Sequence, residues 1–185
     1  IAISTPKFNI HKFKIPQTFI NQTQFEFVHI NTHINPFKAF INLFCKSSYH
    51  IERFYSKAFE STLLKTLQNN RFDIIQFESI YTTPYIDLIK KHSRAKLILR
   101  AHNVEYKIWE RIASHETNFL KKKYLEHLIP KLKNYETKVL QKMDGILTIT
   151  PEDANILQTY CTVPIHTCPF AIDSSHYQFT PPTNA

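Results

Sequence analysis

The sequence predicts an α/β fold built around a mostly parallel sheet. Three short apolar runs carry this prediction, at residues 72–77, 96–101 and 145–149. Each run has the length of a buried strand, and each is followed by a segment with helical periodicity. Strands that alternate with helices form βαβ units, which place their strands in parallel. The expected arrangement is therefore a three-layer, Rossmann-like domain, and 43% hydrophobic residues in a chain of 185 suffice for its core.

The N-terminal part of the chain predicts two further strands and a helical region. Residues 1–3 are apolar and are expected to end a strand, and residues 25–30 alternate between apolar and polar side chains, which favours a second strand. Residues 36–70 are expected to be helical in two pieces, of which the second ends at Asn69 and Asn70.

The C-terminal half predicts two long helices, a short helix and a last strand. Apolar residues recur at helical spacing over residues 103–115 and 117–143, and Pro130 is expected to kink the second helix. Thr150 precedes a proline and two acidic residues, which is the pattern of an N-cap. Residues 164–170 predict the last short strand.

Composition excludes several kinds of site. The sequence has one glycine, Gly145, whereas a P-loop or a Rossmann dinucleotide loop needs several so that the backbone can approach phosphate. The three cysteines lack C-x-x-C spacing and the ten histidines lack H-E-x-x-H spacing, so we expect no metal site and no disulfide framework. Reduced cysteines fit a cytoplasmic protein. No run of 18 apolar residues predicts a spanning helix.

The net charge of +8 has two explanations. It would suit a polyanionic partner such as a membrane surface, a nucleic acid or a phosphorylated substrate. The abundance of Lys, Ile, Asn and Phe is equally typical of an AT-rich genome. Lys121, Lys122 and Lys123 follow Phe119 and Leu120, and they predict either a basic patch at the inner face of a membrane or a solvated helix face. No nucleic-acid-binding motif is present, so we expect no nucleic-acid partner.

The candidate site residues lie where the predicted strands end. In an open parallel sheet, ligands bind outside the carboxyl ends of the strands. Glu78 follows the first of the three apolar runs and His102 follows the second, with Asn103 and Glu105 directly after it. His102 is expected to be the main site residue, because an imidazole can donate or accept a hydrogen bond near neutral pH. The alternative for His102 is a buried histidine with a structural role.

The other three candidates also have structural alternatives. Glu78 is expected either to orient an acceptor hydroxyl or act as a base, or to pair with Arg100 on the neighbouring strand. Asn103 is expected to cap the following helix in preference to contacting a ligand, and Glu105 to be an acid in the first turn of that helix. Free N–H groups at this junction would favour an anion.

Six short motifs follow one another over residues 70–175. They are residues 72–78, 99–106 with the run Arg-Ala-His-Asn-Val-Glu, 109–111, 135–136, 144–153 and 169–173. In this order they resemble the N-terminal, acceptor-side domain of the family-4 bacterial glycosyltransferases, which have the GT-B fold. Residues 1–70 resemble that domain only loosely.

The resemblance implies a GT-B enzyme in which two Rossmann-like domains face a cleft. Residues 1–169 would form the N-terminal domain, and residues 170–185 a linker or truncated tail. The resemblance further implies a first strand and a glycine-rich loop ahead of Ile1, and a donor domain after Ala185 that binds a UDP- or GDP-sugar. With those parts absent, the isolated chain is expected to be inactive.

The implied reaction is a retaining hexosyl transfer in cell-envelope polysaccharide synthesis. The acceptor would be a glycan or a lipid-linked sugar, the nucleotide sugar would be a co-substrate, and no cofactor or obligatory metal is implied. His102 would face the transferred sugar, with Glu78, Asn103 and Glu105 near the substrate. The residues alone leave a second function open, a non-catalytic, flavodoxin-like module that binds an anion or a protein partner.

Overall fold

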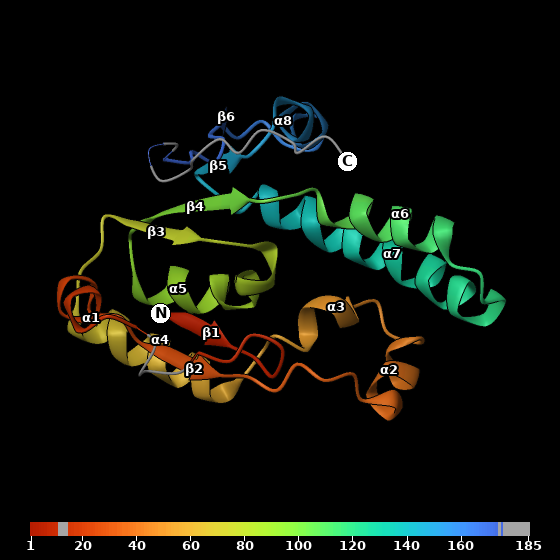
Figure 1. Ribbon diagram of the computed structural model, residues 1–185, viewed down its shortest axis with the longest axis horizontal. Helices are drawn as coiled ribbons and strands as arrows, with labels where there is room; N and C mark the ends of the chain where they lie inside the picture. Colours follow the sequence, from red (N-terminus) through yellow and green to blue (C-terminus); the bar gives the residue numbers. More distant parts are fainter. Residues whose placement is uncertain (11–14, 174, 176–185) are drawn as a thin grey trace, which may run out of the picture.

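The strands of the fold form two parallel sheets (Figure 1), in a computed structural model that describes residues 1–10, 15–173 and 175. The larger sheet has the order β3-β4-β5-β6, and the smaller sheet pairs β1 with β2. The strands are β1 (Ala2–Ser4), β2 (Phe27–His29), β3 (Ile74–Phe77), β4 (Lys96–Ala101), β5 (Gly145–Thr148) and β6 (Ile165–Thr167). The predicted α/β class and the parallel sheet are confirmed, in a Rossmann-like arrangement.

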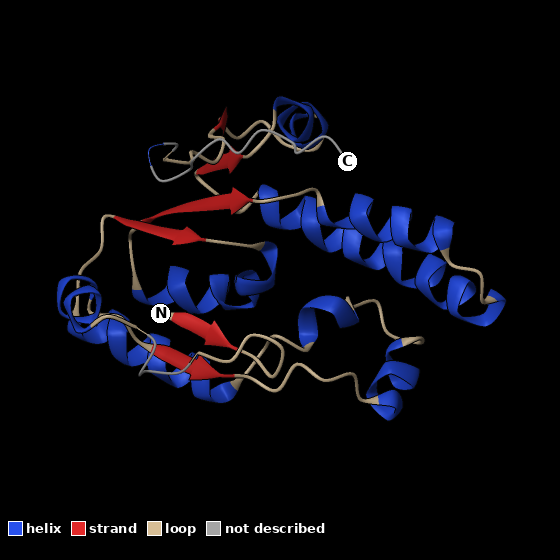
Figure 2. Ribbon diagram, viewed as in Figure 1, coloured by secondary structure: helices blue, strands red, loops and turns tan. Residues whose placement is uncertain are grey.

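Helices connect the strands and cover the sheets (Figure 2). They are α1 (Gln17–Thr23), α2 (Pro36–Asn42), α3 (Tyr49–Glu52), α4 (Lys57–Asn69), the 3-10 helix η2 (Ile80–Tyr85), α5 (Ile86–His92), α6 (Glu105–His115), α7 (Phe119–Leu140) and α8 (Pro151–Gln158). The helix α7 continues through Pro130 and returns alongside α6 as a helical hairpin (Figure 1).

The region 36–70 differs from its prediction, because it holds three helices where the sequence predicted two. Ser48 and Ser56 each have extended backbone dihedral angles and precede α3 and α4 as their N-cap residues. An extended residue interrupts the helical hydrogen bonds, so the chain restarts a helix after each serine. The N-cap predicted at Thr150 is confirmed, since its hydroxyl accepts a hydrogen bond from the backbone N–H of Asp153.

The two faces of the larger sheet are covered unequally. Side chains alternate between the faces of a strand. On β4, Leu97 and Leu99 are each only 1% exposed and pack in the core with buried residues of α5 and α7. Ile98 and Arg100, on the other face of the same strand, are half-buried. Polar side chains on this second face can therefore reach solvent.

The single glycine is explained by packing between strands. A Cβ atom on Gly145 would lie 3.0 Å from Cδ1 of Ile98 on the neighbouring strand β4. Its φ angle is not positive, so the backbone here does not require a glycine. Gly145 thus serves close packing of β5 against β4.

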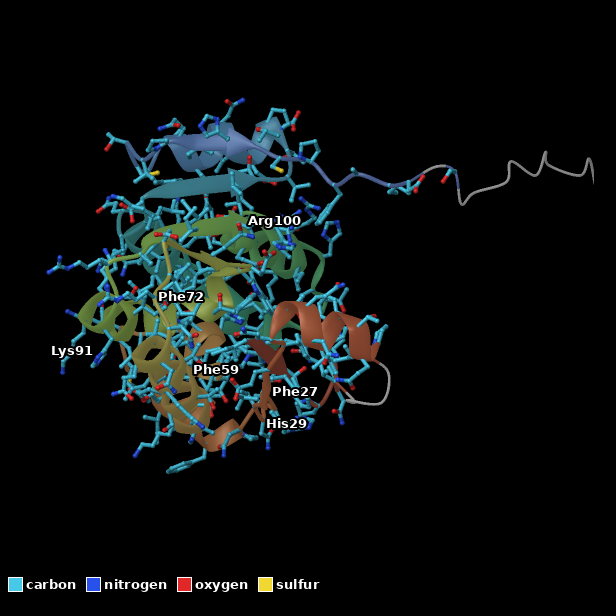
Figure 3. All side chains as sticks on the ribbon, turned by 90° about the vertical axis from the view of Figure 1, so that its left-hand side faces the viewer. Phe27, His29, Phe59, Phe72, Lys91 and Arg100 are labelled. Atoms are coloured by element: carbon cyan, nitrogen blue, oxygen red, sulfur yellow. The ribbon has the colours of Figure 1, made fainter. Side chains whose placement is uncertain are left out.

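A groove separates the two sheets. In the described part of the chain, β1 pairs only with β2 and β3 only with β4, so each has one unpaired edge. The residues of β3 line a mainly apolar groove of about 270 Å³, to which Ile1 and Phe59 also contribute and which extends to Gln76 and Glu78. Figure 3 shows Phe72 close to the larger sheet and Phe59 nearer the smaller one.

Candidate functional site

Two of the predicted site residues lie side by side at the carboxyl edge of the larger sheet. Glu78 directly follows β3 and His102 directly follows β4, and these two strands are parallel neighbours. The register pairs Phe77 with Leu99, so the residues that follow, Glu78 and Arg100, are also neighbours. The structure therefore brings the ends of these two strands to one edge of the sheet.

Alternation along the strands puts four polar side chains on the same face. Gln76 and Glu78 are two residues apart, as are Arg100 and His102, so all four extend from the less covered face of the sheet. Figure 3 shows Arg100 on β4, on the side of the sheet away from Lys91. We call these four residues, Gln76, Glu78, Arg100 and His102, the Glu78 cluster.

The carboxylate of Glu78 is the centre of this cluster. Its Oε2 atom lies 3.1 Å from Nε2 of His102 and 3.6 Å from the Arg100 guanidinium. The side-chain amide of Gln76 donates a hydrogen bond to Oε1. The predicted pairing of Glu78 with Arg100 is therefore present, and His102 shares the same oxygen.

The surroundings of Glu78 keep it ionised. Partial burial acts against the charged form, but hydrogen bonds from Gln76 and His102 and the charge of Arg100 outweigh it, so the pKa of Glu78 lies below its ordinary value. An ionised carboxylate can only accept hydrogen bonds, so Nε2 of His102 must carry the shared hydrogen. Nδ1 of a neutral His102 is then a hydrogen-bond acceptor, on a side chain that is 36% exposed.

Phe170 completes the surroundings of His102, and the sequence did not predict this role. The Arg100 guanidinium lies 4.9 Å from the centre of the Phe170 ring, and the His102 ring meets it edge-on at 5.8 Å. Phe170 follows β6, so the signal in the sequence was an aromatic residue after another strand end. The Phe170 ring therefore contacts both basic members of the Glu78 cluster.

The start of α6 differs from its prediction. Asn103 was predicted as the N-cap, but the helix begins at Glu105 with Val104 as its N-cap residue, and the Asn103 side chain is exposed. The N–H groups of Glu105 and Tyr106 donate to the carboxylate of Glu136 on α7, over 2.9 and 3.1 Å. A side chain from another helix thus replaces the local cap.

Glu136 is a buried carboxylate that the sequence analysis did not single out as functional. It is 3% exposed. Burial raises its pKa to about 7, although the two backbone hydrogen bonds act in the opposite direction. The position where an anion was expected at this helix N-terminus is therefore occupied by a carboxyl group of the protein itself.

Glu105 makes its hydrogen bond outside the Glu78 cluster, although the charge of His102 acts to lower its pKa. It is an acid in the first turn of α6, as predicted, and its carboxylate accepts a 2.9 Å hydrogen bond from the Tyr81 hydroxyl. Burial raises the pKa of Glu105, and the Tyr81 hydrogen bond opposes that rise. Of the four predicted site residues, the structure therefore joins Glu78 with His102 by a hydrogen bond, and it gives Asn103 and Glu105 no direct hydrogen bond to either of them among the described contacts.

Within residues 1–10, 15–173 and 175, no group of three or more His, Cys, Asp or Glu side chains is arranged to hold a metal ion. No helix there combines the length and the apolar character needed to cross a bilayer.

Comparison of the chain with protein-family models, with curated proteins and with solved structures found no match.

Proposed function

We propose that this chain is the acceptor-side domain of a retaining GT-B glycosyltransferase. The complete enzyme would transfer a hexose from a UDP- or GDP-sugar to a glycan or lipid-linked acceptor. The observation that carries the proposal is the Glu78–His102 pair at the carboxyl edge of a parallel sheet, where ligands of open α/β sheets bind. The motifs at residues 72–78 and 99–106, which supply both residues, support it through their resemblance to that enzyme family.

In this proposal His102 positions the sugar. A retaining transfer develops positive charge on the sugar ring and negative charge on the leaving phosphate. Nδ1 of His102 would accept a hydrogen bond from a sugar hydroxyl, and Glu78 would hold the required tautomer and ring orientation through Nε2. Arg100 would keep Glu78 ionised, so that His102 remains oriented.

The proposal assigns the nucleotide to the donor domain that the resemblance implies. A diphosphate needs several backbone N–H donors. The one glycine of this chain is used in strand packing, and the first N–H groups of α6 are bonded to Glu136. Both observations favour a division of labour in which this domain holds the acceptor.

The same hydrogen bonds weigh against the non-catalytic alternative. An anion-binding module would use the junction between β4 and α6, where the helix dipole favours negative charge. There the Glu105 and Tyr106 N–H groups already have a hydrogen-bond partner in the Glu136 carboxyl group. The enzyme is therefore the function that we propose.

A transferase assay on the complete gene product tests the proposal. Radiolabelled UDP- and GDP-hexoses would be incubated with the protein and with lipid-linked and soluble glycan acceptors. We expect transfer from one donor class, with the anomeric configuration retained in the product by NMR. Absence of transfer and of donor hydrolysis across the whole panel would contradict the proposal, as would an inverted product.

A further inference from the structure

The helix α2 presents its apolar side to solvent. Phe37 and Phe40 are three residues apart and share one face of the helix, and Phe44, in the turn after α2, contacts the Phe40 ring; the three side chains are 72%, 60% and 80% exposed. Ala39 and Asn42, on the opposite face, are buried. A helix of a soluble domain normally has the reverse arrangement, with its apolar face inside.

Neighbouring residues enlarge this surface. Ile34, just before the helix, is 65% exposed and Ile41 is 47% exposed, while the Phe40 and Phe44 rings touch edge-on at 5.7 Å. We call these five residues, Ile34, Phe37, Phe40, Ile41 and Phe44, the α2 apolar face. Contiguous apolar surface of this kind marks an interaction site, whereas single exposed apolar residues are ordinary.

The start of α7 adds a second apolar and basic element at the same end of the molecule (Figure 1). Phe119 is 69% and Leu120 is 78% exposed, and Lys121, Lys122 and Lys123 follow them. Further along α7, Lys131 donates hydrogen bonds to the backbone oxygens of Asn42 and Leu43, and Nε2 of His127 lies 3.0 Å from the latter. These contacts fix the C-terminus of α2 against α7.

The two sequence segments that form this surface carry basic residues and no acidic ones. Residues 31–49 contain two lysines and no acidic residue, and residues 117–125 contain three lysines and no acidic residue. Glu116 and Glu126 pair with Lys121 and Lys123 from outside the second segment. In the described part of the chain no ion pair is formed by Lys38, Lys46 or Lys122, so the surface keeps a positive excess.

We propose that the α2 apolar face and the basic start of α7 together dock this protein onto an anionic lipid bilayer. The aromatic and aliphatic side chains would enter the interface between headgroups and acyl chains, and the lysines would meet the lipid phosphates. This inference is independent of the proposed transfer reaction, because it uses none of the residues of the Glu78 cluster.

Charge decides between a bilayer and a second copy of the chain. A symmetric dimer through this face would bring the lysines of two copies together, and like charges across an interface are unfavourable. An anionic bilayer offers the complementary charge over the whole face. The occupant with matching chemistry is therefore a lipid surface.

Vesicle flotation with the 185-residue chain tests the proposal. Binding to vesicles of phosphatidylcholine that contain about 30% of the anionic lipid phosphatidylglycerol would be compared with binding to vesicles of pure phosphatidylcholine. We expect binding to the anionic vesicles that is lost at high salt. The triple substitutions Phe37→Ser/Phe40→Ser/Phe44→Ser and Lys121→Glu/Lys122→Glu/Lys123→Glu should each lower the partition coefficient by about tenfold or more.

Matched control variants test whether any loss of an exposed aromatic residue or of positive charge lowers vesicle binding, or only a loss at this surface. Phe8→Ser removes an aromatic residue that is 68% exposed elsewhere, and Lys90→Glu/Lys91→Glu changes exposed charge on α5, where Figure 3 shows Lys91 projecting into solvent. Both controls should bind vesicles as the wild type does, and circular dichroism should show all variants folded. Equal binding by wild type and both triple variants would overturn the proposal.

A spectroscopic measurement covers the case in which a triple variant misfolds. Phe40→Trp places a reporter on the α2 apolar face, and brominated lipids quench tryptophan that enters the acyl region. We expect stronger quenching than for wild type, whose single tryptophan, Trp109, is only partly exposed. Unchanged quenching, or a wild-type dimer that Phe37→Ser/Phe40→Ser/Phe44→Ser makes monomeric without affecting flotation, would overturn the proposal.

Discussion

Glu136 of α7 accepts a 2.9 Å hydrogen bond from the backbone N–H of Glu105, the first residue of α6. The two residues are 31 positions apart, and the bond joins the two helices of the hairpin at the end where β4 leads into α6. The loop that carries His102 lies directly before this point. A buried carboxylate thus fixes the position of the segment that presents the candidate site.

The first prediction concerns the pH dependence that Glu136 gives to stability. Its pKa is raised from 4.5 to about 7 by burial, so the folded state binds its proton more tightly than the unfolded state. The stabilising contribution is complete below pH 4.5 and is lost as the pH rises to 7, with a magnitude of about 3 kcal/mol. Urea unfolding between pH 4.5 and 8 should show this loss in wild type. Glu136→Gln should flatten it, and equal slopes in both proteins would contradict the assignment.

His50 is predicted to act in the opposite direction. Burial, with a further effect of the Arg53 charge, lowers its pKa from 6.5 to about 4. The contribution of His50 to stability is therefore complete above pH 6.5 and is lost as the pH falls to 4, again by about 3 kcal/mol. His50→Phe should remove this acid-side loss and keep the ring contact with Trp109, whose ring centre is 4.0 Å away. His92→Gln, at an exposed histidine, is the control and should leave the loss of stability at acidic pH unchanged.

For His102 we predict a loss of turnover without a loss of fold. Its side chain is partly exposed and has one hydrogen bond, to Glu78, so His102→Ala should change the free energy of unfolding by no more than about 1 kcal/mol. Removal of a preorganised contact to the reacting sugar should lower kcat by about 10²–10³. The complete enzyme would be assayed for kcat and for Tm, with Lys91→Ala as the control. A large fall in Tm with normal turnover would assign His102 a structural role.

Glu78 is predicted to act through His102, which a double-mutant cycle can detect. Glu78→Gln removes the charge that holds Nε2 and should lower kcat by about tenfold or more. If Glu78 only orients the imidazole, adding Glu78→Gln to His102→Ala should cost almost nothing further, because residues that act as a unit are not additive. Fully additive losses in kcat would show that Glu78 contacts the substrate independently of His102.

Sugar nucleotides are predicted to bind the 185-residue chain weakly. The backbone N–H groups at the start of α6 are bonded to Glu136, and the sequence has no glycine-rich loop. Calorimetry with UDP- and GDP-hexoses should give dissociation constants no tighter than about 1 mM, which corresponds to about 4 kcal/mol of binding. Submicromolar binding would contradict the assignment of the donor to another domain.

The sequence predicted the bounds of a central strand more accurately than those of an edge strand. The strand β4 matches its predicted residues 96–101 from end to end, since it is flanked by strands on both sides and buries one whole face. The strand β3 begins two residues later than predicted. It is an edge strand, and its first residue, Ile74, is 59% exposed.

The sequence could predict those site residues whose position depends only on where two neighbouring parallel strands end. Glu78 and His102 meet because parallel neighbours end at one edge, which the sequence pattern contained. The position of Phe170 depends on where the chain turns after β6, and the cap of α6 depends on Glu136, a residue on another helix. Local propensity favoured Asn103 as that cap, and a long-range hydrogen bond replaced it.

The edge strand β3 has one side without a strand partner among the described residues. Unpaired edges are templates for a further strand, and the residues of β3 line the apolar groove. Gln76 and Glu78 line the groove and also belong to the Glu78 cluster. A segment bound in the groove would therefore lie next to the carboxylate that is hydrogen-bonded to His102.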